Sequence, residues 1–397
     1  MLDMETDIDS IDSLYKATHV LSPTRLNIYI EGSVSMDGYM NEKDFATQLY
    51  QVYSTLLNNL TFTKSDKHNP YNLITANSDT CVIAKIPCTD PKRVRDWLRP
   101  GNVQGKITGR GKSDIAEVIK SVIGSTKDGA LSILVSDCAF SPSDSKGAED
   151  QLRNQSEDIH SALNNRMSQD PDFCVVVYRL VSKFNGKHYD SKDQGQEYHG
   201  DRPYFLWIFG ERGVIAQAVN LIDKRLNNDS IKFDRIVAGK PIGYIPYMCD
   251  EAAHGYHVLN ATTDADSVYT LTFYLDMTTV PYGEDYILDK HNYQVLSNDD
   301  EFEIIDIVKD NTQVGYSHKI TVNLYGSDRF KTVSPSCVEF GLNQPKFGEQ
   351  WKSAIYNSED GKDPGRVTTF GLQSLVDGIE QSYDLTGQYF IVKTLIN

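Results

Sequence analysis

Short continuous apolar runs alternate with segments of helical pattern along the N-terminal half of the chain. The strand-like runs occupy residues 26–30, 80–86, 131–135, 173–180 and 204–209. The helical segments occupy residues 41–60, 114–123, 148–167 and 214–226. Continuous apolar strands are typical of a sheet that helices cover on both faces. We therefore expect residues 23–228 to form an α/β domain with a Rossmann-like, doubly wound, mostly parallel sheet.

The pattern changes in the C-terminal part, where strand-like segments show period-two alternation and turn signals separate them. These segments cover residues 268–275, 301–308, 318–324 and 389–395. Residues 370–383 alone show a helical spacing of apolar positions. We expect residues 229–397 to form a smaller β-rich, sandwich-like domain with one packed helix, and residues 1–22 to form a flexible acidic N-terminal segment.

The composition of the chain argues against nucleic acids and membranes as partners and indicates a reducing compartment. The net charge of −16 argues against a nucleic-acid-binding surface, which needs clustered Lys and Arg. No segment approaches the ~20 consecutive apolar residues of a membrane span, so we expect no membrane insertion. The six cysteines include no Cys-x-x-Cys pair, and two of them, Cys138 and Cys174, adjoin apolar runs. Reduced, buried thiols and a cytoplasmic location are the expected outcome.

Oxygen-bearing side chains follow the first apolar run. Glu31, Ser33 and Ser35 come directly after residues 26–30. A second hydroxyl source is Ser113, in a glycine-rich stretch before a predicted helix, and Asp137 follows the apolar run 131–135. In parallel sheets ligands gather at the carboxyl ends of strands. Carboxylate and hydroxyl oxygens there are suited to a small divalent cation such as Mg²⁺.

Together these three segments resemble the von Willebrand factor A (vWA) domain with its metal-ion-dependent adhesion site, in the form found in bacterial intracellular members. The motif of that family is Asp-x-Ser-x-Ser, a later Thr and a distant Asp. Matched residue by residue, Glu31 stands for the first Asp, Ser33 and Ser35 match directly, Ser113 replaces the Thr, and Asp137 matches the last Asp. The resemblance covers roughly residues 22–228 and implies a variant adhesion site.

The resemblance implies a non-catalytic protein–protein recognition or assembly module. In the family the protein coordinates the metal incompletely, and a carboxylate of a partner protein completes the shell. Glu31 is one methylene longer than Asp, and Mg²⁺ tolerates little distortion, so Mg²⁺ either binds here or the site is silent. The alternatives are a structural subunit of a multi-protein complex with a silent metal site, and a divalent-metal-dependent hydrolase.

Overall fold

The computed structural model describes residues 22–63, 71–76, 84–87, 114–127, 129–140, 148–189, 194–243, 245–249, 252–253, 257–258, 268–296, 302–325, 336–346, 351, 369–383 and 385–396. Its chain contacts divide into two compact units. The first, here called the α/β unit, comprises residues 20–239 and 346–384. The second, here called the β unit, contains residues 240–345 and 385–397. Each is described by itself.

A seven-stranded sheet forms the centre of the α/β unit, in the order β3-β2-β1-β4-β6-β5-β7 among the described strands. The strands are β1 (Leu26–Glu31), β2 (Tyr71–Ala76), β3 (Ala84–Pro87), β4 (Leu131–Ser136), β5 (Phe173–Tyr189), β6 (Gly195–Glu211) and β7 (Phe233–Ala238). Strand β1 runs parallel to β2 and to β4. The remaining pairs, β2–β3, β4–β6, β6–β5 and β5–β7, are antiparallel.

The prediction of a doubly wound, mostly parallel sheet is therefore wrong, because antiparallel pairs outnumber parallel ones among the described strands. The physical reason lies in the connection between β5 and β6. The apolar runs 173–180 and 204–209 are separated by enough residues for a helical crossover, but the intervening residues extend both strands instead. Only the short segment from Tyr189 to Gly195 joins them, and a parallel pair needs a connection of a dozen or more residues.

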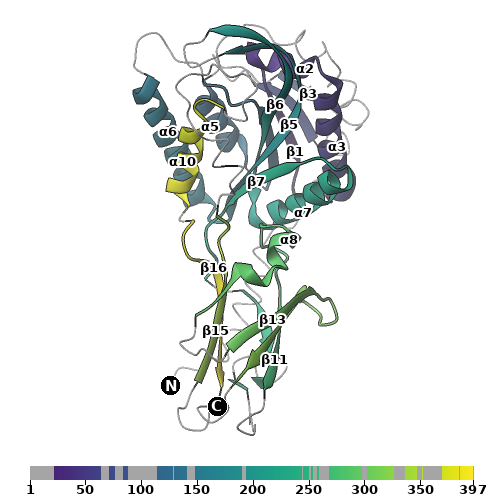
Figure 1. Cartoon of the computed structure of the whole chain (residues 1–397), viewed down its shortest axis with the longest axis vertical. Coiled ribbons are helices and arrows are strands. Elements are labelled where there is room, and N and C mark those ends of the chain that lie inside the picture. Colours follow the sequence, from purple (N-terminus) through teal and green to yellow (C-terminus); the bar gives the residue numbers. More distant parts are fainter. Residues whose placement is uncertain are drawn as a thin grey trace. The chain divides into compact units, whose positions relative to one another are not determined.

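Helices lie on both sides of this sheet (Figure 1). On one side lie α5 (Ile115–Ser125), α6 (Ala148–Gln169) and α10 (Leu372–Ser382); on the other lie α3 (Lys43–Asn59) and α7 (Arg212–Asn228). Helix α3 buries Phe45, Leu49, Val52 and Leu56, at the spacing that places them on one face. Strands β1 and β4 are buried along their whole lengths, as expected for strands covered on both faces.

The outer halves of β5 and β6 project beyond the rest of the sheet. The pairing of β4 with β6 ends at Ser136 and Phe205, and that of β5 with β7 ends at Leu180 and Phe233. Beyond these points β5 and β6 continue to pair with each other. We call residues 181–189 and 195–203 the ribbon. Because β6 is antiparallel to β4, the ribbon extends past the carboxyl end of β4.

The β unit contains two sheets. One has the order β12-β15-β16-β10-β9, and the other has the order β13-β14-β11-β8, among the described strands. Their strands are β8 (Tyr247–Cys249), β9 (Ala252–Ala253), β10 (His257–Val258), β11 (Tyr269–Leu275), β12 (Tyr293–Val295), β13 (Phe302–Lys309), β14 (His318–Leu324), β15 (Ser336–Asn343) and β16 (Gln388–Ile396). The sheets pack through Phe340, whose ring centroid lies 5.3 Å from that of Phe273 and 6.1 Å from that of Phe302.

The helix predicted within residues 370–383 exists, as α10, but its placement in the β-rich domain is wrong. Helix α10 belongs to the α/β unit and packs on α6, where Gly378 adjoins Ile159. At Gly378 the helix therefore packs closely on another helix. The helices described in the β unit are the short α8 (Glu284–Ile287) and the 3₁₀ helix η3 (Lys290–Asn292).

Candidate functional site at the ends of β1 and β4

Two carboxylates lie at the carboxyl ends of neighbouring parallel strands. Glu31 is the last residue of β1, and Asp137 follows the last residue of β4. The register pairs Ile30 with Val135, so the two strands end at the same edge of the sheet. Glu31 is 1% exposed and Asp137 is 2% exposed. Burying two acidic groups is costly unless hydrogen bonds or cations compensate for the lost water.

Hydrogen bonds hold the Glu31 carboxylate on both of its oxygens. The backbone N–H of Ser33 donates to Oε1 at 3.0 Å, and the Ser136 hydroxyl donates to Oε2 at 3.2 Å. The Ser136 oxygen accepts in turn from the backbone N–H of Cys138 at 2.8 Å. Ser136 thus ties the loop after β4 to the carboxylate after β1. This role is not evident from the sequence, although Ser136 directly precedes Asp137.

The backbone N–H of Ser33 and the hydroxyls of Ser33 and Ser35 link Glu31 to Asp137. Ser33 and Ser35 are joined by a hydrogen bond of 2.8 Å between their Oγ atoms. The Ser35 hydroxyl in turn lies close enough to the Asp137 carboxylate to favour its ionised form, which lowers the pKa of that carboxyl. Asp137 also accepts from the backbone N–H of Ala139 at 3.1 Å. The loop holds this arrangement because it forms the 3₁₀ helix η1 (Val34–Met36) and runs directly into the short helix α2 (Asp37–Met40).

Four of the five predicted site residues therefore form one chain of contacts: Glu31, Ser33, Ser35 and Asp137. The fifth, Ser113, lies outside the described residues. Its neighbour Asp114 is the N-cap of α5, where its carboxylate accepts from the backbone N–H of Glu117 at 3.1 Å. Asp114 thereby satisfies a donor that the first turn of the helix leaves open.

A buried arginine, absent from the sequence-based prediction, lies next to this group. Arg202 of the ribbon is 3% exposed. Its Nε donates to the Tyr39 hydroxyl at 3.4 Å, and its guanidinium stacks on Phe184 at 5.1 Å from the ring centroid. Its Nη1 donates to Nδ1 of His188. Burial raises the pKa of Asp137, and the positive charge of Arg202 opposes that rise.

The donor set fits a small, hard cation. Two carboxylates and two hydroxyls supply the oxygen ligands that Mg²⁺ prefers, and the Ser33–Ser35 oxygen separation of 2.8 Å approaches the ~3 Å between adjacent ligands of an octahedral Mg²⁺ ion. Within the described ranges no three His, Cys, Asp or Glu residues converge as a metal-binding group. A cation here would therefore depend on the hydroxyls as well as on Glu31 and Asp137.

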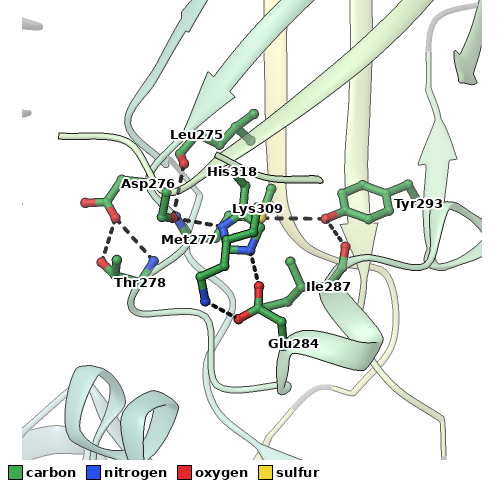
Figure 2. Close-up of polar contacts among 10 residues, drawn as sticks. Leu275, Asp276, Met277, Thr278, Glu284, Ile287, Tyr293, Lys309 and His318 are labelled. Atoms are coloured by element: carbon green, nitrogen blue, oxygen red, sulfur yellow. Dashed lines mark hydrogen bonds and ion pairs between the residues drawn. The ribbon is translucent and has the colours of Figure 1, made fainter. Parts of the chain in front are cut away.

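A second polar cluster lies in the β unit (Figure 2). The imidazole of His318 contacts Glu284 Oε1 through Nε2 at 2.7 Å and the Ser317 hydroxyl through Nδ1 at 2.8 Å. Lys309 Nζ lies 2.7 Å from Glu284 Oε2. The Ser317 oxygen already accepts from the backbone N–H of Met277 at 2.9 Å. Ser317 and His318 are 6% and 3% exposed, so the cluster ties strand ends together and offers no accessible nucleophile.

Comparisons with known proteins assign the chain to no family. A search of protein-family models finds no match to the chain. A search of curated proteins finds no match either. In the part of the chain that the structure describes, every helix is too short or too polar to cross a membrane.

Proposed function

We propose that the protein is a non-catalytic recognition module that binds another protein through a divalent cation, Mg²⁺. Glu31, Ser33, Ser35 and Asp137 would hold the ion, with Ser113 as the further ligand that the resemblance to vWA domains implies. The observation that carries the proposal is the series of contacts from Glu31 through the Ser33 backbone N–H and the Ser33 and Ser35 hydroxyls to Asp137. When bound, Mg²⁺ supplies an open coordination position that attracts a carboxylate of the partner.

The other residues of the site orient the ligands. The Ser33 amide and the Ser136 hydroxyl fix the Glu31 carboxylate, and the Ala139 amide fixes that of Asp137. These bonds compensate for the longer side chain of Glu31 by restricting where its oxygens lie. Preorganised ligands lower the entropy lost on binding, which supports a cation site despite the Glu-for-Asp substitution.

A structural role with a silent metal site is the second candidate. It is favoured by Arg202, whose buried guanidinium already supplies positive charge near Asp137. In that case the chain of hydrogen bonds stabilises the loops after β1 and β4, and binding to other subunits uses surfaces that need no ion.

Thermal stability under Mg²⁺ titration separates the two candidates. The wild type should gain stability as Mg²⁺ is added, since a ligand that binds the folded state raises its stability by mass action. The Ser33→Ala/Ser35→Ala double variant should show no such gain. The matched control is Ser54→Ala/Ser168→Ala, which removes hydroxyls that donate to backbone carbonyls of their own helices and should leave the response intact. A wild type that does not respond favours the silent site.

Recovery of partners from cell extracts tests the recognition step. A partner that is released by a chelator and that fails to bind the Ser33/Ser35 double variant supports ion-mediated binding. A partner retained under both conditions supports the structural candidate. If the protein hydrolyses a phosphodiester substrate in the presence of Mg²⁺ and the same variant does not, the protein is a hydrolase. Both the recognition module and the structural role would then be wrong.

We place the protein in the cytoplasm. Cys138, Cys174 and Cys249 are free and buried, which supports a reducing compartment.

A further inference from the structure

Arg202 occupies an unusual position for a cationic side chain. It lies on β6 two residues before Tyr204, on the same face of the strand, and is almost completely shielded from water. The strand register places it above the end of β4: Ser136 pairs with Phe205, and Asp137 is the next residue. The ribbon therefore carries the guanidinium over the edge where the two carboxylates lie.

Contacts on several sides keep the guanidinium in place. Tyr39, in α2, accepts a hydrogen bond from Nε and donates one to the carbonyl of Pro203. Phe184 covers one face of the guanidinium, and His188 accepts from Nη1. Arg cannot lose its proton in a protein, so the positive charge persists at every physiological pH. Its electrostatic effect on Asp137 is a fixed feature of the fold.

A divalent cation and this guanidinium act on the same carboxylate. Both stabilise the ionised form of Asp137, and the two positive charges repel each other across a poorly hydrated site. Mg²⁺ can bind tightly only where net negative charge remains. The positive charge of Arg202 offsets negative charge on the buried carboxylates, which leaves less of it to attract a doubly charged ion.

We infer that Arg202 is a built-in counter-ion that sets the affinity of the site for divalent cations, weakening Mg²⁺ binding while it keeps the ion-free protein folded. This inference rests on the proposed cation site and deepens it, since it names the residue that regulates that site. Arg202 is a positioning residue in this scheme, because it acts on the ion through Asp137 and through the electrostatic field of the site.

The experiment measures the dissociation constant of Mg²⁺ by calorimetry on the full chain. Arg202→Gln and Arg202→Met remove the charge while keeping a long side chain. Both should bind Mg²⁺ at least roughly tenfold more tightly than the wild type, because a unit charge several ångströms from a divalent ion opposes binding by more than the ~1.4 kcal/mol that corresponds to tenfold. Arg202→Lys, which keeps the charge, should stay close to the wild type.

The matched control is Lys183→Met, which removes one positive charge from the exposed face of the same ribbon. Lys183 forms an ion pair with Asp201 at 2.6 Å, and both side chains are solvent-exposed, so its loss should leave the Mg²⁺ affinity unchanged. A purely structural role for Arg202 would lower the stability of its variants but would not tighten cation binding. Tighter binding is therefore the distinguishing result.

The outcomes separate this inference from the proposed function. If the wild type binds Mg²⁺ and the Arg202 variants bind it equally well or more weakly, the inference is overturned and the cation site stands. If only the variants bind, the inference stands and the natural site is silent. If neither the wild type nor the variants bind Mg²⁺, both the inference and the proposed function are wrong.

If the Arg202 variants do not fold, the NMR resonance of the Nε–H group of Arg202 in the wild type provides the test. Added Mg²⁺ should shift this resonance, and Mg²⁺ binding without a shift overturns the inference.

Discussion

The backbone of Gly186 in the ribbon passes so close to Gly38 in α2 that a Cβ atom on Gly186 would lie 2.8 Å from the Cα atom of Gly38. A Cβ atom on Gly38 would in turn lie 2.3 Å from two atoms of the Phe184 ring. Both residues must therefore lack a side chain for the ribbon to lie against the loop that follows Ser33 and Ser35. This contact connects the ribbon, which carries Arg202, to the candidate site.

Replacing Gly38 or Gly186 by Ala should destabilise the α/β unit by roughly 1–3 kcal/mol each, because overpacking forces neighbouring groups to move. Gly186→Ala should be the more harmful, since it meets backbone, whereas Gly38→Ala meets a side chain. Urea denaturation followed by tryptophan fluorescence can measure the change, as Trp207 and Trp351 are buried in this unit. Gly124→Ala in α5 of the same unit, which meets no atom within 4 Å and should not destabilise, is the control. Unchanged stability in Gly186→Ala would contradict the close approach.

Gly378 in α10 provides a test of how α10 packs on α6. A Cβ atom there would lie 2.7 Å from Ile159 Cβ and 2.8 Å from the carbonyl oxygen of Ser156. Gly→Ala in a helix normally gains up to ~1 kcal/mol, but the steric clash should reverse the sign and cost roughly 1–3 kcal/mol. Gly124→Ala in α5, which has open space, should instead stabilise. Equal effects of the two substitutions would show that α10 does not pack closely on α6.

The Glu284 carboxylate should make the β unit sensitive to acid. Hydrogen bonds from His318 and Lys309 lower its pKa from 4.5 to about 2. A carboxyl group whose pKa is lowered by folding contributes stability above its unfolded pKa and loses it as the pH falls. This contribution, roughly 2 kcal/mol after allowance for solvent screening, should be present near neutral pH and disappear between about pH 4.5 and 2.

Calorimetric unfolding scans of the wild type and Glu284→Gln across this range can check the prediction. The variant should be less stable than the wild type at neutral pH, and the difference should shrink as the pH falls. Glu157→Gln, which changes an exposed carboxylate on α6, should follow the wild type throughout. A difference between wild type and Glu284→Gln that stays constant with pH would show that the ion pair is not the cause.

The thiols of Cys138 and Cys174 should be unreactive in the folded protein. Burial raises the pKa of Cys174 to about 12 and raises that of Cys138 as well, and the Cys138 sulfur accepts from the indole N–H of Trp207 at 3.2 Å. The thiolate is the reactive species, so both should resist alkylation at mildly alkaline pH. Mass spectrometry of iodoacetamide-treated protein, native and in guanidinium chloride, measures this. Labelling of native Cys138 would contradict its burial.

The sequence predicted most of the individual elements well, because their burial leaves a regular pattern. Residues 318–324 are strand β14 as predicted, and the helical pattern at 114–123 corresponds to α5. The topology could not be predicted in the same way. The ribbon halves of β5 and β6 are mostly polar and exposed, so no apolar run marked them as strands, and the direct hairpin between the two remained hidden.

The candidate site was partly predictable for a related reason. Glu31 and Asp137 each follow a buried run, and strand ends are recognisable from sequence. Arg202 gave no such signal, because it lies two residues before its apolar run, between Asp201 and Pro203. Its position depends on the pairing of β6 with β4, which is a long-range contact that no local pattern encodes.

The ribbon also has a consequence for self-association. Past Leu180 and Phe205 its two strands pair, among the described strands, only with each other. Neither outer edge is therefore covered by another described strand, although the carbonyls of Val181 and Pro203 accept from Gln48 and Tyr39. Such edges invite pairing with a second copy of the chain. Along this stretch the exposed side chains with a formal charge are Lys183, Lys187, Glu197 and Asp201. Charges at these positions must shed water before another strand can approach, so the ribbon can extend from the sheet without acting as a template for aggregation.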